Sequence, residues 1–372
     1  MRLERISLWQ FALLTFISRS VLTIAELPGR AAGRDVWLAT ILFVALGIPL
    51  ISFYNSLARR FPHQNVFEYA VELLGPWLGR IVTLPLLWGF LHFSAFVLRV
   101  YGEMIVTAVL PQTPLVVIMG GMIFVCAVGV RSGLHALGRA AEILVPLFVV
   151  GILGVILFAL PDAHFNRLQP VAGEGWSPIW EGMLHGSVFF FFYSVIFVIY
   201  PAVGDKARLN RAAILATLAA GALITAAAAV AVAVFGPHEL KRLAVPFLHL
   251  ARHIRVAQFV ERIETVAIAA WGVGLFLELT LVYHAATRGL GVWLGIKRDY
   301  RLVLPMGSIL LTLALILFPN SFEFREFFRI DVIVPYSLFL IFWVPMVLWT
   351  AMLLGAGKGR RKRGERGNRR AP

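Results

Sequence analysis

The chain has 372 residues, of which 59% are hydrophobic and only 15% are charged. Soluble globular proteins contain roughly 45–50% apolar and about 25% charged residues. The composition therefore excludes a soluble globular protein, and it also excludes a disordered chain, a secreted disulfide-stabilised domain and a coiled coil. It indicates an all-α integral membrane protein that crosses the bilayer many times.

Ten segments are long and apolar enough to cross a membrane, because a hydrocarbon core of roughly 30 Å needs about 20 helical residues. The first five predicted spans are Leu8–Leu27, Val36–Leu57, Ile81–Leu110, Leu115–Val130 and Ile143–Leu160. The second five are Met183–Val203, Ala212–Phe235, Val266–Leu290, Leu302–Phe318 and Val332–Leu354. Residues 1–357 are therefore predicted to form one ten-span transmembrane domain.

Lysine and arginine are distributed unevenly among the predicted connections. With the N-terminus placed inside, 22 of these residues fall on the inside and 10 in outside segments, when Arg288 at the inner end of the eighth span is counted with the connection that follows it. Because cytoplasmic loops carry an excess of Lys and Arg, both termini are predicted to be cytoplasmic.

The net charge is +14, and half of it lies in residues 358–372. This segment is predicted to be a disordered cytoplasmic tail that contacts anionic lipid headgroups, with no role in binding nucleic acid.

One outside connection, residues 236–265, does not follow the charge rule, since it carries five basic residues. Within it, LKRLAVPFLHLARHI (residues 240–254) has apolar residues at helical spacing. This pattern predicts an amphipathic helix that lies on the membrane surface or caps the bundle.

Ionisable residues inside predicted spans are the candidate functional residues, because each costs roughly 2.5–3.5 kcal/mol on insertion scales. Arg19 lies near the middle of the first span and Glu278 near the middle of the eighth. Thr23 follows Arg19 by four residues and so lies on the same helix face. Gly274 lies one turn from Glu278, where it would leave room for a partner side chain.

The third span carries a secondary group of candidates, His92, Arg99 and Glu103, which share one helix face. Arg99 and Glu103 are four residues apart, and this spacing is more typical of an ion pair near the interface than of a site. The sequence contains no phosphate-binding loop, HExxH motif or metal-ligand cluster, so neither an enzyme nor a cofactor or metal is predicted.

Six stretches together resemble the spore germination receptor B-subunit family, the GerAB-type proteins of the amino acid–polyamine–organocation transporter superfamily. The similarity covers nearly the whole chain, and it depends on the order and spacing of the stretches within the ten-span frame. They are AGRDVWLA (32–39), ARRFPHQNVFEYAVELLGPWLGRI (58–81), LRVYGEMIVTAVLPQTP (98–114), RSGLHALGRAAEILVP (131–146), FVERIETVAIAAWGVG (259–274) and KRDYRLVLPMG (297–307).

This resemblance implies a LeuT-type fold, in which spans one to five and six to ten form two inverted repeats around a ligand site at mid-membrane. In such folds spans one and six are broken. Span one of the family usually carries glycines near its middle, whereas this chain has Ser18-Arg19-Ser20 there. In span six, Gly186 and Ser187 form the flexible pair, and Tyr193 is a candidate for lining the pocket.

The same fold would bring the first and eighth spans together around the central cavity. Arg19 and Glu278 are therefore predicted to meet, because opposite charges offset each other's desolvation. A structural ion pair and a role in ligand binding are both compatible with this pattern.

By resemblance, the function is that of a transporter-like subunit of a nutrient-germinant receptor in the spore inner membrane or the cell membrane. It would bind a small molecule such as an amino acid, and it would assemble with an A-type subunit and a C-type lipoprotein subunit. The alternative is a secondary amino-acid transporter coupled to H⁺ or Na⁺, and a third possibility is an assembly subunit that binds no ligand.

Overall fold

The computed structural model describes residues 5–27, 30–243, 245–254, 263–296, 299–318, 327 and 329–355. The predicted basic tail, residues 358–372, lies outside the described residues. Within the described part the chain is almost entirely helical, and its extended pairing is a single bridge between Ile6 and Val203.

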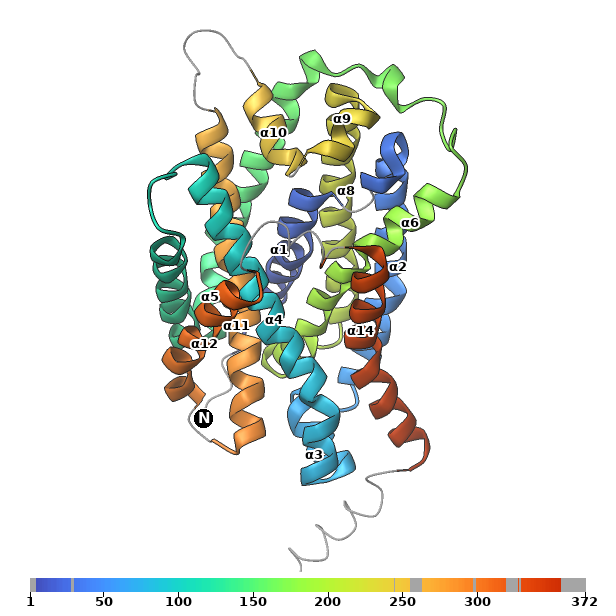
Figure 1. Ribbon diagram of the computed structural model, residues 1–372. Coiled ribbons are helices and arrows are strands. Elements are labelled where there is room, and N and C mark those ends of the chain that lie inside the picture. The colour runs from blue at the N-terminus through green and yellow to red at the C-terminus, as the bar shows by residue number, and fades with distance from the viewer. Residues whose placement is uncertain are drawn as a thin grey trace, which may run out of the picture.

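The helices lie at the positions along the chain where spans were predicted (Figure 1). The first half contains α1 (Leu8–Glu26), α2 (Val36–Ala58), α3 (Val66–Leu74), α4 (Pro76–Ala108) and α5 (Leu115–Ala159). The second half begins with α6 (Ser177–His185), the 3₁₀ segment η4 (Gly186–Val195), α7 (Ile196–Ile199) and α8 (Leu209–Phe235). It continues with α9 (Pro237–Arg242), α10 (Pro246–His253), α11 (Ile263–Leu294), α12 (Val303–Ile316) and α14 (Ile330–Leu353).

Eight of the helical segments are long and apolar enough to cross a membrane, and the shorter apolar helix Leu8–Ile24 adds another. Helix α5 contains two spans, because Gly133 interrupts it with φ 87° and ψ 170°. The described part of the chain therefore accounts for the ten predicted spans. The connection between the fourth and fifth predicted spans, residues 131–142, is helical on both sides of Gly133.

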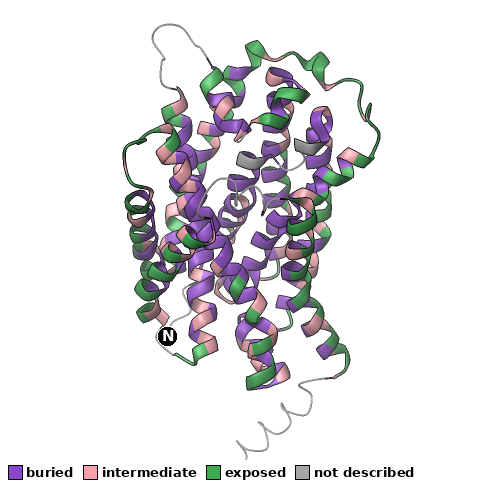
Figure 2. Ribbon diagram, in the orientation of Figure 1, coloured by how far each residue is buried: buried purple, intermediate pink, exposed green. Residues whose placement is uncertain are grey.

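The sixth span, formed by α6, η4 and α7, is the centre of the molecule. In the most apolar window of Ser177–Ala202, 89% of the residues are buried, compared with 28% for the window that contains α12. Figure 2 shows the same contrast, with buried residues filling the inner helices and exposed residues on the outer ones. The first span, α1, packs against η4, α5, α8 and α11.

Local sequence signals explain where α1 begins and where it ends. Ser7 caps the helix in a reciprocal arrangement with Gln10, in which each side chain bonds the other residue's backbone N–H. Helix α1 then continues without a break to Glu26, and Leu27 ends it in the left-handed conformation. The break expected within span one of a LeuT-type fold is therefore absent from the described residues 8–26.

The predicted amphipathic helix of residues 240–254 is two short helices, α9 and α10, at one end of the bundle (Figure 1). Helix α10 buries Phe247, Leu248 and Leu250 against α1, α5, α8 and α11. Of the two predicted positions, capping of the bundle is therefore the one that the structure shows. The described chain starts, and α14 ends, at the opposite end of the bundle.

Candidate functional site

The central segment η4 differs from the other spans in its helix type. It forms a 3₁₀ helix of ten residues, all of them buried, whereas 3₁₀ runs longer than three or four residues are uncommon and often mark a hinge. The predicted flexible pair, Gly186 and Ser187, opens this segment. The hydroxyl of Ser187 lies 3.0 Å from that of Ser337 on α14.

The aromatic residues that follow connect η4 to two neighbouring helices. Phe190 stacks on Phe43 of α2, with ring centroids 4.4 Å apart. Phe191 stacks on Phe93 of α4 at 4.6 Å. One stack therefore holds η4 against α2, and the other holds it against α4.

Arg19 lies at the middle of α1 and contacts η4 through Tyr193. Its guanidinium carbon is 4.0 Å from the centroid of the Tyr193 ring, and only 6% of the residue's surface is exposed. Its Nη1 donates hydrogen bonds to the Thr15 carbonyl at 2.8 Å and to the Ser18 hydroxyl at 3.0 Å. A cation over a ring is stabilised by about 2 kcal/mol or more where water is excluded.

Tyr193 fits against α2 because Gly47 has no side chain. A β-carbon built on Gly47 would lie 2.4 Å from the Tyr193 hydroxyl oxygen and 3.0 Å from a ring carbon. Gly47 therefore provides the space that the tyrosine occupies, and Tyr193 in turn lies under Arg19.

A small cavity lies beside Arg19, between α1, η4, α7 and α11. About 10 Å³ is open to the centre of a water molecule, which is room for about one water. The described conformation is therefore closed around the predicted site. The lining residues are Phe11, Leu14, Thr15, Ser18, Arg19, Phe192, Val195, Ile196, Ile199 and Leu281.

Glu278 is buried on α11, with 1% of its surface exposed, and its Oε2 has no hydrogen-bond partner among the residues that the structure describes. Among the described residues, Arg19 and Glu278 do not form an ion pair, so the predicted pairing is wrong for this conformation. The physical reason is that the flexible arginine reaches the Tyr193 ring on η4. The sequence named Tyr193 as a pocket residue but did not show that it faces Arg19.

Gly274 is the point of close approach between α11 and two other helices. A β-carbon there would lie 2.8 Å from Val21 of α1 and 2.9 Å from Phe148 of α5. The indole N–H of Trp271 also donates to the Val21 carbonyl at 3.2 Å. The space next to Gly274 is therefore filled by apolar packing, and it does not hold a partner for Glu278. Thr23 is buried in the same part of α1.

The secondary candidates on α4 separate into two unrelated groups. Arg99 and Glu103 form the predicted ion pair, with Nη2 and Oε1 2.6 Å apart and the Glu103 side chain 42% exposed. His92 instead contacts α14, where its Nδ1 lies 2.7 Å from the Tyr336 hydroxyl. The Tyr336 oxygen also accepts a hydrogen bond from the Trp88 indole at 3.1 Å.

Tyr336 and Ser337 are consecutive residues of α14 that were not predicted as site residues. Tyr336 contacts α4 and Ser337 contacts η4. Tyr336 reaches His92, and Ser337 reaches Ser187. Two consecutive polar residues in an apolar span are the signal that could have identified them.

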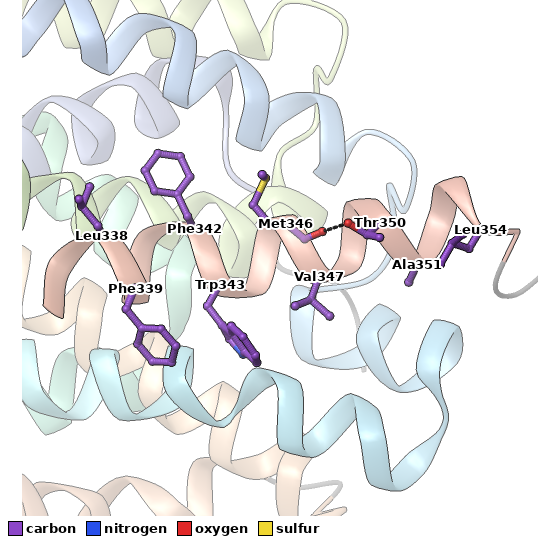
Figure 3. Close-up of a pocket in the computed structure, with 9 residues that line it drawn as sticks. All are labelled: Leu338, Phe339, Phe342, Trp343, Met346, Val347, Thr350, Ala351 and Leu354. Carbon is purple, nitrogen blue, oxygen red and sulfur yellow. Dashed lines mark hydrogen bonds between the residues drawn. The ribbon is translucent and has the colours of Figure 1, made fainter. Parts of the chain in front are cut away.

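A larger depression, of about 630 Å³, is lined entirely by residues of α14 and by Leu354, which caps its C-terminal end (Figure 3). Its lining is apolar apart from Thr350, whose hydroxyl donates to the Met346 carbonyl at 2.8 Å. Phe339 and Trp343 point to one side of α14 and Phe342 to the other. An open apolar face of this kind on an outer span is suited to lipid contact.

The fold is similar to that of solved membrane-transporter structures. The structure aligns with MhsT in complex with L-phenylalanine at a TM-score of 0.67 and 15% identity, covering 94% of this chain and 98% of that one. It aligns with a Na⁺-coupled sialic acid symporter at a TM-score of 0.64 and 10% identity, covering 91% and 79%. The LeuT-type fold implied by the resemblance is confirmed, and at these identities the likeness shows the fold alone.

Sequence relatives give the family. Spore germination protein KB of Bacillus subtilis (strain 168) is 27% identical over 329 residues, covering 87% of this chain and 88% of the relative. Spore germination protein A2 of the same organism is 25% identical over 295 residues, covering 78% and 80%. The model of the family described as "Spore germination protein" matches residues 5–323. The chain therefore belongs to this spore germination protein family, as a multi-pass membrane protein of the germinant-receptor B-subunit type with a LeuT-type fold.

Proposed function

We propose that this subunit binds its small-molecule germinant at the centre of the bundle, between α1 and η4. The observation that carries the proposal is the contact between Arg19 and Tyr193, where a buried cation lies beside a small cavity and a long 3₁₀ segment. Ionisable residues inside a membrane bundle are functional candidates by default. A ligand that favours an opened arrangement of η4 would shift the population of the bundle towards it.

Partner subunits are the second part of the proposal. The relatives are named as spore germination proteins, and the resemblance implies assembly with an A-type subunit and a C-type lipoprotein. Affinity purification from spore membranes is expected to recover both partners. Recovery of a single chain that moves an amino acid into vesicles would instead support the secondary transporter.

The orientation is also proposed, with both termini on the cytoplasmic side of the spore inner membrane. Support comes from the bias of 22 inside to 10 outside basic residues. The start of the described chain and the end of α14 lie at the same end of the bundle, as this orientation requires (Figure 1).

The test of the ligand site is a germination assay with a deletion strain that carries variants of this gene. Wild-type protein is expected to restore germination on at least one nutrient of a panel. Gly47→Leu, which fills the position of Tyr193, is expected to abolish that response. A β-carbon at Gly120 would have no other atom within 4 Å, so Gly120→Ala is the control for adding a side chain at a helical glycine. A normal response of the Gly47→Leu strain, at a normal protein level, would place the ligand elsewhere.

A further inference from the structure

Arg19 is a buried cation on α1. No described acidic side chain forms an ion pair with it, and its Nε is buried without a hydrogen-bond acceptor. Its Nη1 donates hydrogen bonds to the Thr15 carbonyl and the Ser18 hydroxyl of its own helix, and the guanidinium lies over the Tyr193 ring. A charge removed from water is costly unless it is paired, so this guanidinium retains the capacity to bind an anion.

The cavity beside Arg19 has two chemically different walls. Thr15, Ser18 and Arg19 supply polar groups from α1. Phe192 and Val195 of η4 and Leu281 of α11 supply apolar groups. A molecule that fits both walls carries an anionic group at one end and an apolar body at the other.

We infer that Arg19 is the anion-binding group of the ligand site and that it binds the carboxylate of a small ligand with an apolar body. The inference rests on the proposed function, which places a ligand at this cavity. A guanidinium presents N–H donors in a planar fork that matches a carboxylate and strengthens each hydrogen bond by its charge. Thr15 and Ser18 position the fork through Nη1, and Nε remains available to the carboxylate.

Room for the apolar body comes from η4. Phe192 and Val195 are three residues apart and so lie in one row of the 3₁₀ helix. Both line the cavity, so a displacement of this one segment enlarges the space beside Arg19 while α1 stays in place.

The experiment measures thermal unfolding of the purified full-length protein, with its partner subunits where they co-purify, against ligand concentration. The probes are 4-methylpentanoate and its uncharged amide, which share one shape and differ in charge. Wild type is expected to bind the carboxylate at least about tenfold more tightly than the amide, since a hydrogen bond to a charged group adds roughly this much. Arg19→Gln is expected to bind both equally, and Arg19→Lys to retain part of the preference.

The control is Arg99→Gln, which also removes a membrane-embedded arginine but one that is already paired with Glu103. It is expected to keep the wild-type preference. Because the readout is a ratio within each variant, a change in overall stability does not imitate the result.

Four outcomes overturn the inference. They are equal binding of the two probes by wild type, no binding of either, a preference that survives in Arg19→Gln, and stabilisation by chloride in sulfate buffer without any by the carboxylate. Equal binding that is lost in Gly47→Leu removes the anion-binding role but leaves the proposed ligand site intact. A germination response that is normal in Gly47→Leu spores removes the site itself.

Discussion

The guanidinium carbon of Arg19 lies 4.0 Å from the centre of the Tyr193 ring, and this contact joins span one to the 3₁₀ segment of span six. In a LeuT-type fold these are two of the spans around the central site. The contact thus provides a direct physical link between a charge on α1 and the position of η4.

The aromatic ring of Tyr193 is expected to matter more than its hydroxyl. Tyr193→Leu should destabilise the protein by about 2 kcal/mol, because the buried guanidinium loses its cation–π contact. Tyr193→Phe keeps the ring and should cost about 1 kcal/mol or less. Thermal unfolding of the purified variants checks this, and equal losses for Leu and Phe would contradict a role for the ring.

Gly47 is expected to control the position of Tyr193. Gly47→Ala places a methyl group 2.4 Å from the tyrosine hydroxyl and should cost about 1–3 kcal/mol by overpacking. Tyr193→Phe removes the clashing oxygen, so the double variant should recover part of that loss, and a double-mutant cycle measures the coupling. Gly120→Ala serves as the control. Additive effects of Gly47→Ala and Tyr193→Phe would show that the two residues are not coupled.

Glu278 is expected to tolerate loss of its charge. Because no described cation pairs with it, Glu278→Gln leaves no orphaned charge and should change stability by about 1 kcal/mol or less. An Arg19–Glu278 ion pair would instead make the loss about 3–5 kcal/mol. The double variant that carries both Arg19→Glu and Glu278→Arg should be no more stable than either single variant. Unfolding midpoints of the four proteins decide between these results.

The contact of α14 with α4 is expected to stabilise the bundle through Tyr336. Its oxygen contacts both His92 and Trp88, so Tyr336→Phe leaves the buried His92 imidazole and the exposed Trp88 indole without this partner and should cost about 1–3 kcal/mol. Thr350→Ala, on the outer part of the same helix, removes a bond to its own helix backbone and should cost less. Both variants are compared with wild type by their protein level in the membrane and their unfolding midpoint. Equal losses would argue against a stabilising role of the Tyr336 contacts.

The topology is expected to place both ends of the chain in the cytoplasm. Reporter fusions after Gly357 should give a cytoplasmic signal, and fusions within residues 164–175 an external one, because the basic residues favour this orientation. An external signal after Gly357 would reverse the orientation and leave the helix packing unchanged.

Several features followed from the sequence because they depend on local composition. A run of about 20 apolar residues must be a helix in lipid, since each backbone group needs a partner within the segment. The spans were therefore predictable, as was the Arg99–Glu103 pair, which lies within one helix at i, i+4 spacing. Gly186 and Ser187 marked the place where span six changes its helix type.

Other features were decided by tertiary structure. Helical spacing shows which residues share a face, but it does not show which helix that face meets. Arg19 was therefore assigned to Glu278, whereas the packing of η4 against α1 and α2 brings Tyr193 under its guanidinium. A long arginine side chain can reach several neighbours, so its partner depends on where the whole bundle places aromatic and acidic groups. Composition determined that the charge lies inside the membrane, and only the packing of distant segments determined which group contacts it.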